Sequence, residues 1–385
     1  QAISAQLVSC KRSTGFLRGE AMPSWKLAVF LPLSWACSYV ELPWQGDLDE
    51  EPSYLIARTM ELANLYGTTE YRIEVVPRSG SRTFGYLAPM NLFHLHGLSL
   101  KIPFEGMNEA GLTVSAHYLA QAVYEEPLPG QDTLNALDLV PALLANCSSV
   151  DEATRLLESV KVVAPKVGEQ NFGGLHWAIT DPSGKTLIVE YLEGKRMILE
   201  NHPRVMTNDP DIRWHWRNLN TYVNLSPNYP WQNDILQIKV DDDIGTVPRP
   251  IGHGWNLFGL PGDPSPPSRF ARLFYLRGYA TKAKPLKSFN DAVVLGNALL
   301  NNVFLPIGPI AENPREPGDG PELTDYAVLK SPKDKVMLIR GYVNSQWRQI
   351  DLKRLDFSKS YAWPLEDGSL GVQDITNAGE KLVQI

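Results

Sequence analysis

Cys37 stands directly after a segment with the pattern of a secretory signal. Residues 27–36 (LAVFLPLSWA) are almost all apolar, and several basic residues precede them: Lys11, Arg12, Arg18 and Lys26. Basic residues, then about ten apolar residues, then a small residue form the pattern that signal peptidases cleave. Because Ser34 and Ala36 are both small, we predict cleavage between Ala36 and Cys37. Residues 1–36 are then a leader, and the mature protein is exported, either to a periplasm or out of the cell.

A cysteine at a newly formed amino terminus carries a thiol and an α-amine in one residue. The α-amine has an ordinary pKa of about 7.7–8.0, so it can act as a base at neutral pH. The thiol has only to lose its proton for the thiolate to attack a carbonyl carbon. The sequence therefore predicts that Cys37 is a nucleophile whose own amine is its base.

Two other interpretations of this segment stay open. The apolar stretch also suits a buried strand or helix in an extended amino terminus, in which case the protein keeps residues 1–36. A lipoprotein signal also ends before a cysteine, although Ser34 replaces the aliphatic residue that such a signal carries three positions earlier. Acylation of the Cys37 amine would remove the base. The protein would then be a lipid-anchored or non-catalytic binding protein.

Other reactive residues give weaker patterns. His94 and His96 could hold a metal on one strand face, but no third ligand with recognisable spacing accompanies them, which favours ordinary packing or surface roles. Three cysteines (Cys10, Cys37 and Cys147) are too few for a disulfide scaffold or a four-cysteine zinc site. The sequence also has no glycine-rich phosphate loop and no G-x-S-x-G elbow. We therefore expect no metal and no organic cofactor.

The elements that must position Cys37 are mostly strands. The predicted strands lie at 37–42, 53–61, 71–76, 112–118, 175–180, 185–192, 196–201 and 204–207, with more in 325–356. The first two form a hairpin around a turn-rich loop, and NEAG, from Asn108 to Gly111, is a structural turn before the strand that ends at Tyr118.

The predicted helices come in groups between the groups of strands. They cover residues 132–145, 149–160, 212–224, 267–279 and 288–301, and the one at 212–224 is amphipathic with exposed aromatic residues. Its aromatic residues Trp214, Trp216 and Tyr222 suit a segment that takes part in assembly of the oligomer or that covers the pocket as a lid. Grouped helices and strands, with no linker or repeat between them, indicate an α+β fold with antiparallel sheets, as one domain over residues 37–385.

Composition excludes several classes of function. The chain has 385 residues, of which 43% are apolar and 21% charged, and its net charge is −7. A net negative charge argues against non-specific binding of nucleic acid, which needs a basic face. No apolar run reaches the roughly 18 residues of a membrane span, so an integral membrane protein is not expected. Two glycosylation sequons begin at Asn146 and Asn224, and they matter only in a eukaryotic secretory setting.

Five ordered segments carry a resemblance to a known family. They are Cys37-Ser38, ARTME at 57–61, EGMNEAGLTVSAHY at 105–118, MTNDP at 206–210 and GLPGDPSPPSRF at 259–270. Together they resemble the choloylglycine hydrolase and penicillin V acylase family, whose members are amino-terminal-nucleophile hydrolases of linear amides. The resemblance runs from Cys37 to at least Tyr326. It implies a four-layer αββα sandwich, catalysis without a cofactor and, commonly, a homotetramer.

The resemblance also implies roles for six residues. Cys37 would be nucleophile and base, and the fixed charge of Arg58 would stabilise its thiolate. Glu61 would hold the α-amine. The side-chain amide of Asn208 and the backbone N–H of Tyr118 would donate to the oxyanion, and such donors are typically worth about 3–4 kcal/mol each. Arg269 would support the charges around the nucleophile.

The chain departs from the family pattern at three places. Glu61 replaces the usual aspartate, which adds one methylene and alters how the carboxylate meets the amine. Ser38 replaces the threonine after the nucleophile. The hairpin between Cys37 and Arg58 is longer and carries the acidic insert DLDEE at 47–51, which we expect near the mouth of the site.

The function implied is hydrolysis of an N-acyl amide. Conjugated bile acids, penicillin V and acyl-homoserine lactones all suit a pocket that recognises an apolar acyl group, and we favour a general N-acyl amide hydrolase. The partners expected are such a small molecule and further copies of the chain. The alternative is a catalytically inactive or lipid-anchored binding protein of the same fold.

Overall fold

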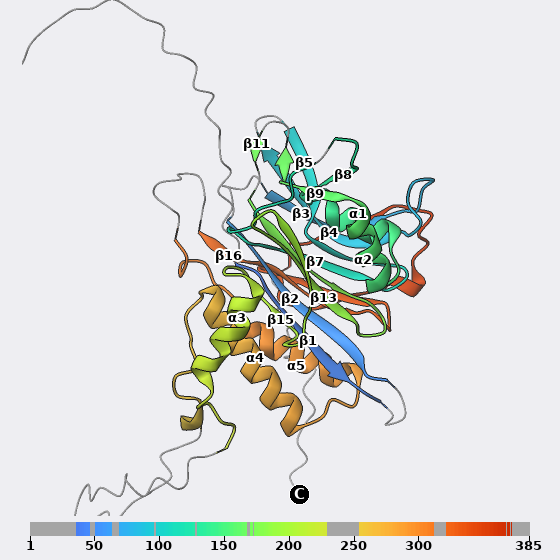
Figure 1. The fold of residues 1–385 in the computed structure, drawn as a ribbon. Coiled ribbons are helices and arrows are strands. Elements are labelled where there is room, and N and C mark those ends of the chain that lie inside the picture. Colours follow the sequence, from blue (N-terminus) through green and yellow to red (C-terminus); the bar gives the residue numbers. More distant parts are fainter. Residues whose placement is uncertain are drawn as a thin grey trace, which may run out of the picture.

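The computed structural model describes residues 36–46, 51–63, 69–95, 98–127, 129–167, 170–171, 173–228, 254–311, 321–366, 368–369 and 371. These residues form two large antiparallel sheets with helices on their outer faces (Figure 1). The predicted α+β class is confirmed. The predicted leader, residues 1–36, lies outside the described residues except for Ala36.

The first sheet has six strands in the order β15–β1–β2–β16–β17–β18. Their bounds are β1 (Ser38–Trp44), β2 (Ser53–Ala63), β15 (Val205–Met206), β16 (Glu322–Ser331), β17 (Val336–Gly341) and β18 (Arg348–Asp351). The predicted hairpin is β1 and β2, in a register that places Tyr39 opposite Arg58. Cys37 thus enters the sheet between two neighbours, β2 and β15.

The second sheet has nine strands in the order β14–β13–β12–β7–β6–β4–β3–β19, with β5 also paired to β4. Their bounds are β3 (Thr69–Val76), β4 (Tyr86–Leu95), β5 (Leu98–Pro103), β6 (Glu105–Asn108), β7 (Thr113–Tyr118), β12 (Leu175–Thr180), β13 (Thr186–Leu192), β14 (Lys195–Glu200) and β19 (Tyr361–Pro364). Two small ribbons, β8 (Thr133–Asn135) with β9 (Lys161–Val163) and β10 (Lys166–Val167) with β11 (Gln170–Asn171), lie apart from it.

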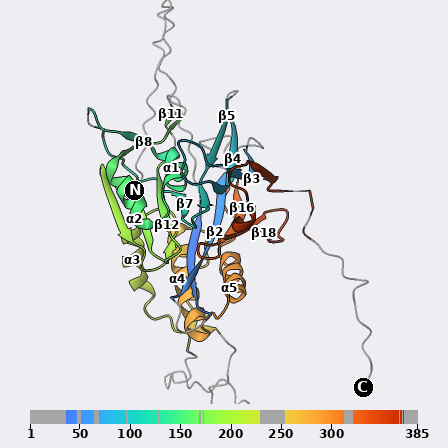
Figure 2. The ribbon, with the colours of Figure 1, turned by 90° about the vertical axis from the view of Figure 1, so that its right-hand side faces the viewer.

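Helices cover the outer face of each sheet. The α-helices are α1 (Leu139–Asn146), α2 (Val150–Ser159), α3 (Ile212–Asn218), α4 (Pro266–Ala283) and α5 (Phe289–Asn301), and the short 3-10 segments are η1 (Ala136–Asp138), η2 (Leu219–Tyr222), η4 (Trp255–Leu257) and η5 (Leu352–Arg354). Helices α4 and α5 pack on the first sheet, and α1 packs on the second. Figure 2 shows β7 and β2 between α2 on one side and α5 on the other. The predicted four-layer αββα sandwich is confirmed.

Strand β16 shows how alternation builds the two cores. Successive side chains of a strand point to opposite faces of its sheet. Tyr326 and Val328 belong to the core shared by the two sheets, whereas Ala327 and Leu329 belong to the core under α4 and α5. The strand is therefore buried on both faces. The run from Tyr326 to Leu329 supplies its apolar contacts, and Lys330 belongs to the polar cluster described below.

The NEAG turn between β6 and β7 is structural, as predicted. The side-chain oxygen of Asn108 accepts from the backbone N–H groups of Ala110 and Leu112, and its amide donates to the carbonyls of Leu144 and Cys147 on the α1 side. Gly111 has φ +100°, a conformation that residues with a Cβ rarely adopt. One turn thus ties the second sheet to its helix layer.

We expect Gly111→Ala to lower the free energy of unfolding by about 2 kcal/mol or more. The left-handed conformation is strained for alanine, and the added Cβ would press against the backbone carbonyl of Pro332. Gly80→Ala is the matched control, because nothing lies near its Cβ position. Urea unfolding of the three proteins tests this, and equal midpoints for the two variants would contradict it.

The predicted helix at 132–145 begins too early. The helix α1 starts only at Leu139, and residues 133–135 form β8, which pairs in parallel with β9. Asn135 accepts from the backbone N–H of Leu137 and so caps the short segment η1 in front of α1. The prediction is wrong because the partner strand lies about thirty residues away, beyond the reach of local propensity.

The predicted amphipathic helix at 212–224 is shorter than expected, and its aromatics are not exposed. The α-helix ends at Asn218 and continues as η2. Trp216 packs against the core under α4 and α5, and the ring of Tyr222 meets Tyr275 edge-on at 6.3 Å. These rings join α3 and η2 to α4.

The acidic insert at 47–51 falls at the tip of the β1 and β2 hairpin, and residues 47–50 lie outside the described residues. The strand ends that flank the tip, Trp44 and Ser53, are paired with each other. The expectation that the insert lies near the mouth of the site stays a prediction.

No helix among the described residues is long and apolar enough to cross a membrane.

Candidate active site

Cys37 lies at the start of β1, where five of the other groups named in the sequence come together. Its side chain is fully buried. Its backbone N–H donates to Oδ1 of Asn208 at 2.9 Å. Its Sγ is 3.7 Å from Nη2 of Arg58 and 4.0 Å from the carbonyl oxygen of Glu61. One residue thus presents both its sulfur and its main-chain nitrogen to polar partners.

Arg58 lies on β2 with its side chain between the two sheets, and several groups there bind its guanidinium. Its Nη1 donates to Oε1 of Glu105 at 2.5 Å, its Nη2 to the carbonyl of Ala116 at 2.9 Å, and its Nε to the ring of His117 at 3.4 Å. Burial acts to lower the pKa of the guanidinium, but Glu105, Cys37 and Tyr326 together outweigh burial, and the net effect raises that pKa. Arg58 is therefore a permanent, oriented cation next to the sulfur.

Glu105 and Lys330 complete a buried charge cluster that the sequence analysis missed. Both side chains are fully buried, and Nζ of Lys330 lies 3.0 Å from Oε2 of Glu105 and 2.9 Å from the hydroxyl of Ser115. Glu105 therefore bridges two cations, and the trio keeps one net positive charge near the sulfur. Glu105 opens the EGMN segment, but nothing in the sequence indicated its partner on β16.

Glu61 occupies the helix side of β2, because it is three residues from Arg58 and alternation puts the two on opposite faces. Its carboxylate accepts from the hydroxyl of Thr324 at 2.6 Å and from that of Thr59 at 3.1 Å. Burial raises its pKa to about 8, and Arg269 offsets this only in part. Glu61 is one methylene longer than the usual aspartate, and in this chain two threonines anchor its carboxyl group.

Asn208, Arg269 and Tyr118 form the other side of the site. Nη2 of Arg269 donates to Oδ1 of Asn208 at 2.8 Å, and Nη1 donates to the carbonyl of Cys37 at 2.6 Å. The side-chain amide of Asn208 donates to the carbonyl of Tyr118 at 3.0 Å. Asn208 is thereby fixed with its oxygen toward Cys37 and its amide nitrogen toward the end of β7.

The start of α4 explains how Arg269 reaches this site. Asp263 accepts from the backbone N–H of Ser265 and from the hydroxyl of Ser268, which caps the first turn of the helix. Nε of Arg269 also donates to the carbonyl of Pro264 at 2.8 Å. The GLPGDPSPP segment, ambiguous as a sequence motif, therefore turns the first helical arginine inward.

Burial dominates the acidity of the nucleophile in this form of the chain. It raises the pKa of the Cys37 thiol to about 12, although Arg58 and Arg269 act in the opposite direction. Cys37 is here in peptide linkage to Ala36, which is itself buried. A thiol of this kind stays protonated at neutral pH unless an adjacent base takes its proton.

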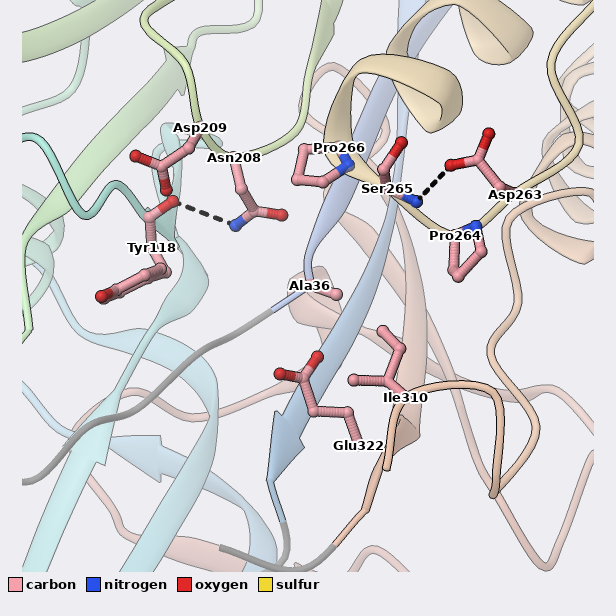
Figure 3. Close-up of a pocket in the computed structure, with 10 residues that line it drawn as sticks. All are labelled: Ala36, Tyr118, Asn208, Asp209, Asp263, Pro264, Ser265, Pro266, Ile310 and Glu322. Atoms are coloured by element: carbon pink, nitrogen blue, oxygen red, sulfur yellow. Dashed lines mark hydrogen bonds between the residues drawn. The ribbon is translucent and has the colours of Figure 1, made fainter. Parts of the chain in front are cut away.

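A pocket of about 390 Å³ opens at Ala36. Figure 3 shows Ala36 among the residues that line it: Tyr118, Asn208, Asp209, Asp263, Pro264, Ser265, Pro266, Ile310 and Glu322. Two of the pocket carboxylates have local partners, because Asp209 accepts from the backbone N–H groups of Ala120 and Gln121, and Asp263 caps α4. The pocket therefore ends where residue 36 joins the nucleophile.

The metal interpretation of the histidine pair gains no support. His96 lies outside the described residues, and nothing is described of the His94 side chain. Within the described part of the chain, histidine, cysteine, aspartate and glutamate nowhere gather in a group of three or more that could hold a metal.

The structure also shows buried histidines behind Asn208. His215 donates from Nε2 to the carbonyl of Asn208 at 2.9 Å and stacks on Phe270 at 4.6 Å. Its Nδ1 has no partner, and burial lowers its pKa to about 4. The imidazole is therefore neutral in the folded protein at neutral pH.

This histidine should make stability fall in mild acid. The folded-state pKa lies below the unfolded value of about 6.5, so the unfolded chain binds more protons between pH 6.5 and pH 4. The contribution of neutral His215 to the free energy of unfolding is complete above pH 6.5. It is lost as the pH falls to 4, and the loss amounts to up to ~3 kcal/mol. Urea unfolding at several pH values should show a shallower loss in His215→Gln than in the wild type. The exposed His202→Gln is the control, and equal slopes for wild type and His215→Gln would contradict the assignment.

Comparison with known proteins connects this geometry to a family. The model of the linear amide C–N hydrolases, choloylglycine hydrolase family, matches residues 48–366. The bile salt hydrolase/transferase of Clostridium perfringens is 31% identical over 255 residues, which cover 65% of this chain and 72% of that protein.

Two solved structures share the fold. A mutant conjugated bile acid hydrolase from Clostridium perfringens superposes with a TM-score of 0.72 at 24% identity, over 88% of this chain and 99% of that one. The penicillin V acylase from Agrobacterium tumefaciens gives 0.58 at 22% identity, over 84% and 88% of the two chains. Because the family model matches most of its sequence, the chain belongs to the choloylglycine hydrolase family of linear amide C–N hydrolases.

Proposed function

We propose that the protein hydrolyses N-acyl amides with Cys37 as an amino-terminal nucleophile, after export and removal of residues 1–36. The observation that carries the proposal is the placement of both reactive atoms of Cys37. The main-chain nitrogen is fixed by Asn208 at 2.9 Å, and the sulfur lies 3.7 Å from Arg58. Cleavage before Cys37 would turn the fixed nitrogen into an amine beside the thiol that it must deprotonate.

Removal of residue 36 also supplies room for a substrate. Ala36 is 6% exposed and lines the pocket next to Asn208 and Tyr118. The peptide bond between Ala36 and Cys37 therefore lies where a scissile amide has to approach the sulfur. Its removal joins the pocket to the nucleophile.

Acylation then follows from the arrangement. The α-amine takes the thiol proton, and the thiolate attacks the carbonyl carbon of the amide. As the C–N bond breaks, the amine returns the proton to the leaving nitrogen, and a thioester remains on Cys37. Arg58 favours the thiolate, because it forms with Glu105 and Lys330 a buried cluster that carries one net positive charge.

The residues on the other side of the site, Asn208, Tyr118 and Arg269, serve to stabilise the oxyanion in acylation and in hydrolysis of the thioester. We assign the side-chain amide of Asn208 and the backbone N–H of Tyr118 as the donors for the tetrahedral oxyanion. The hydrogen bond from the Asn208 amide to the Tyr118 carbonyl, which joins the two residues, supports this assignment. Arg269 holds Asn208 and the Cys37 carbonyl. Water, activated by the same amine, hydrolyses the thioester and restores the free cysteine.

The substrate class follows from the pocket and the relatives. The walls formed by Pro264, Pro266, Ile310 and the Tyr118 ring suit an apolar acyl group. Relatives named for bile salts and for penicillin V share the family and the fold respectively. We therefore favour an N-acyl amide hydrolase that acts on conjugated bile acids, penicillin V or acyl-homoserine lactones.

A substrate panel tests the proposal. The natively expressed protein is assayed for amine release from glycine-conjugated bile acid, penicillin V and an acyl-homoserine lactone. We expect turnover of at least one class, abolished by Cys37→Ala. No turnover of any class, with a leader retained or the Cys37 amine acylated, would favour a binding protein instead.

We also propose a homo-oligomeric assembly, on the basis of the family resemblance. Light scattering coupled to size exclusion should give a mass of several chains, and a monomer would overturn this part of the proposal.

A further inference from the structure

Three buried histidines hold the backbone beneath Asn208, and the mechanism above makes no use of them. They are His117 on β7, His176 on β12 and His215 on α3, and each side chain is no more than 1% exposed. His117 and His176 stand directly opposite each other in the register of β7 and β12. Three different elements thus direct imidazoles toward one short segment, Thr207–Asn208.

Each imidazole holds a carbonyl of that segment. Nδ1 of His117 lies 2.8 Å from the Thr207 carbonyl, and Nε2 of His176 lies 3.1 Å from the same oxygen. Nε2 of His215 lies 2.9 Å from the carbonyl of Asn208 itself. A carbonyl oxygen only accepts, so each of these ring nitrogens carries a proton and donates it.

The outer side of the network is anchored by a buried carboxylate. Nδ1 of His176 lies 3.0 Å from Oε1 of Glu190, which also accepts from the backbone N–H of Ile212 at 3.0 Å. Ile212 begins α3, the helix that carries His215. The segment between Thr207 and α3 is therefore fastened to the second sheet at both ends.

The inner side of the network reaches the nucleophile. Nε2 of His117 accepts from Nε of Arg58, whose Nη2 faces the Cys37 sulfur. His117 also directly precedes Tyr118, and its two ring nitrogens link the thiolate side of the site to the oxyanion side. Burial, and then the nearby charge of Arg58, lower the pKa of His117, consistent with a neutral ring that donates on one side and accepts on the other.

We propose that His117, His176 and His215, with Glu190, are positioning residues for the oxyanion donor Asn208. They fix the main chain at Thr207 and Asn208, so the Asn208 side chain stays directed at Cys37, Arg269 and Tyr118 in both chemical steps. None of the three rings lines the substrate pocket, so they act through Asn208 and not on the substrate. This inference rests on the proposed function.

The histidine with the simplest surroundings gives the sharpest test. His215 makes one hydrogen bond, to the Asn208 carbonyl, and its other ring nitrogen has no partner. His215→Leu removes that bond and keeps an apolar contact with Phe270. His215→Gln can restore it, because the glutamine amide nitrogen replaces Nε2. His202→Leu, at an exposed position, is the control for loss of an imidazole elsewhere.

Two reactions of Cys37 are measured on each purified protein. Amide turnover forms an oxyanion and needs Asn208, whereas alkylation of the thiol by iodoacetamide forms none. We expect His215→Leu to lower kcat by about 10- to 100-fold, with KM and the alkylation rate within twofold of the wild type. His215→Gln should recover most of the loss, and His202→Leu should match the wild type.

The other outcomes overturn the proposal. Unchanged turnover in His215→Leu would show that the bond does not position Asn208. A parallel loss of turnover, alkylation and thermal stability would show a structural role alone. If His215→Leu does not fold, His215→Asn, whose shorter amide does not reach the carbonyl, takes its place. Failure of the proposed function is distinguishable, because the wild type itself would then show no turnover that depends on Cys37.

Discussion

Cys37→Ala is expected to abolish amide hydrolysis while the protein stays folded. The substitution removes the nucleophilic sulfur and with it the covalent thioester step, so turnover should fall by on the order of 10⁴-fold or more. The lost contacts of Sγ are weak ones, to Met60 and to Arg58 at 3.7 Å and to the Glu61 carbonyl at 4.0 Å. The free energy of unfolding should therefore change by only about 1 kcal/mol. Steady-state kinetics and urea unfolding measure the two effects.

The chain offers a matched control for this variant. Cys147 is also a buried free cysteine in the shared core, and it lies near α1, away from the site. Cys147→Ala makes the same chemical change, should cost similar stability and should leave turnover intact. Comparable activity in the two alanine variants would contradict the role given to Cys37.

Arg58→Met has the second largest expected effect, on activity and stability together. It removes the cation nearest to the sulfur and leaves Glu105 with Lys330 as its only charged partner. We expect kcat/KM to fall by about 10²- to 10³-fold and the free energy of unfolding to fall by about 3 kcal/mol, because one member of a buried ion pair is lost. The pH dependence of Cys37 alkylation should shift upward, since the thiolate loses its nearest positive neighbour.

Two further substitutions separate these two effects. In Arg58→Met/Glu105→Gln/Lys330→Met all three charges of the buried cluster are removed together, so no buried charge is left without a partner and much of the lost stability should return. Activity should not return, because the cation beside Sγ is still missing. If the triple variant regained both, Arg58 would serve the fold and not the thiolate.

Much of the fold was predictable because its signals are local. Turn residues and period-two patterns indicated the β1 and β2 hairpin and the meander from β12 to β14. The helices predicted at 149–160 and 288–301 each begin with a serine, and Ser149 and Ser288 do accept from backbone N–H groups at the starts of α2 and α5. The helix predicted from residue 132 was wrong at its start, because β8 forms only through a distant strand.

The candidate site was predictable as a set of residues but not as a set of contacts. The ordered motifs named Cys37, Arg58, Glu61, Tyr118, Asn208 and Arg269, and the fold brings their atoms together. Their roles in catalysis stay predictions. The anchoring of Glu61 by Thr324 depends on the pairing of β2 with β16, which no single motif encodes.

The supporting residues were missed for the same reason. Lys330 follows the run YAVL at 326–329 as one of several polar residues of its strand, and only the packing of the two sheets against each other shows Glu105 beside it. His176 reads as an ordinary strand residue of LHWAIT until the Thr207 carbonyl is seen beside it. Buried polar groups find partners across the fold, so their pairs are a property of tertiary structure.

Peptide mass spectrometry of the natively expressed enzyme, quenched in acid during turnover, tests the central claim most directly. The account predicts a peptide that begins at Cys37 with a free α-amine and a fraction of that peptide that carries the acyl mass on its sulfur. A turning-over enzyme whose Cys37 is still joined to Ala36, or whose acyl group lies on another residue, would contradict it.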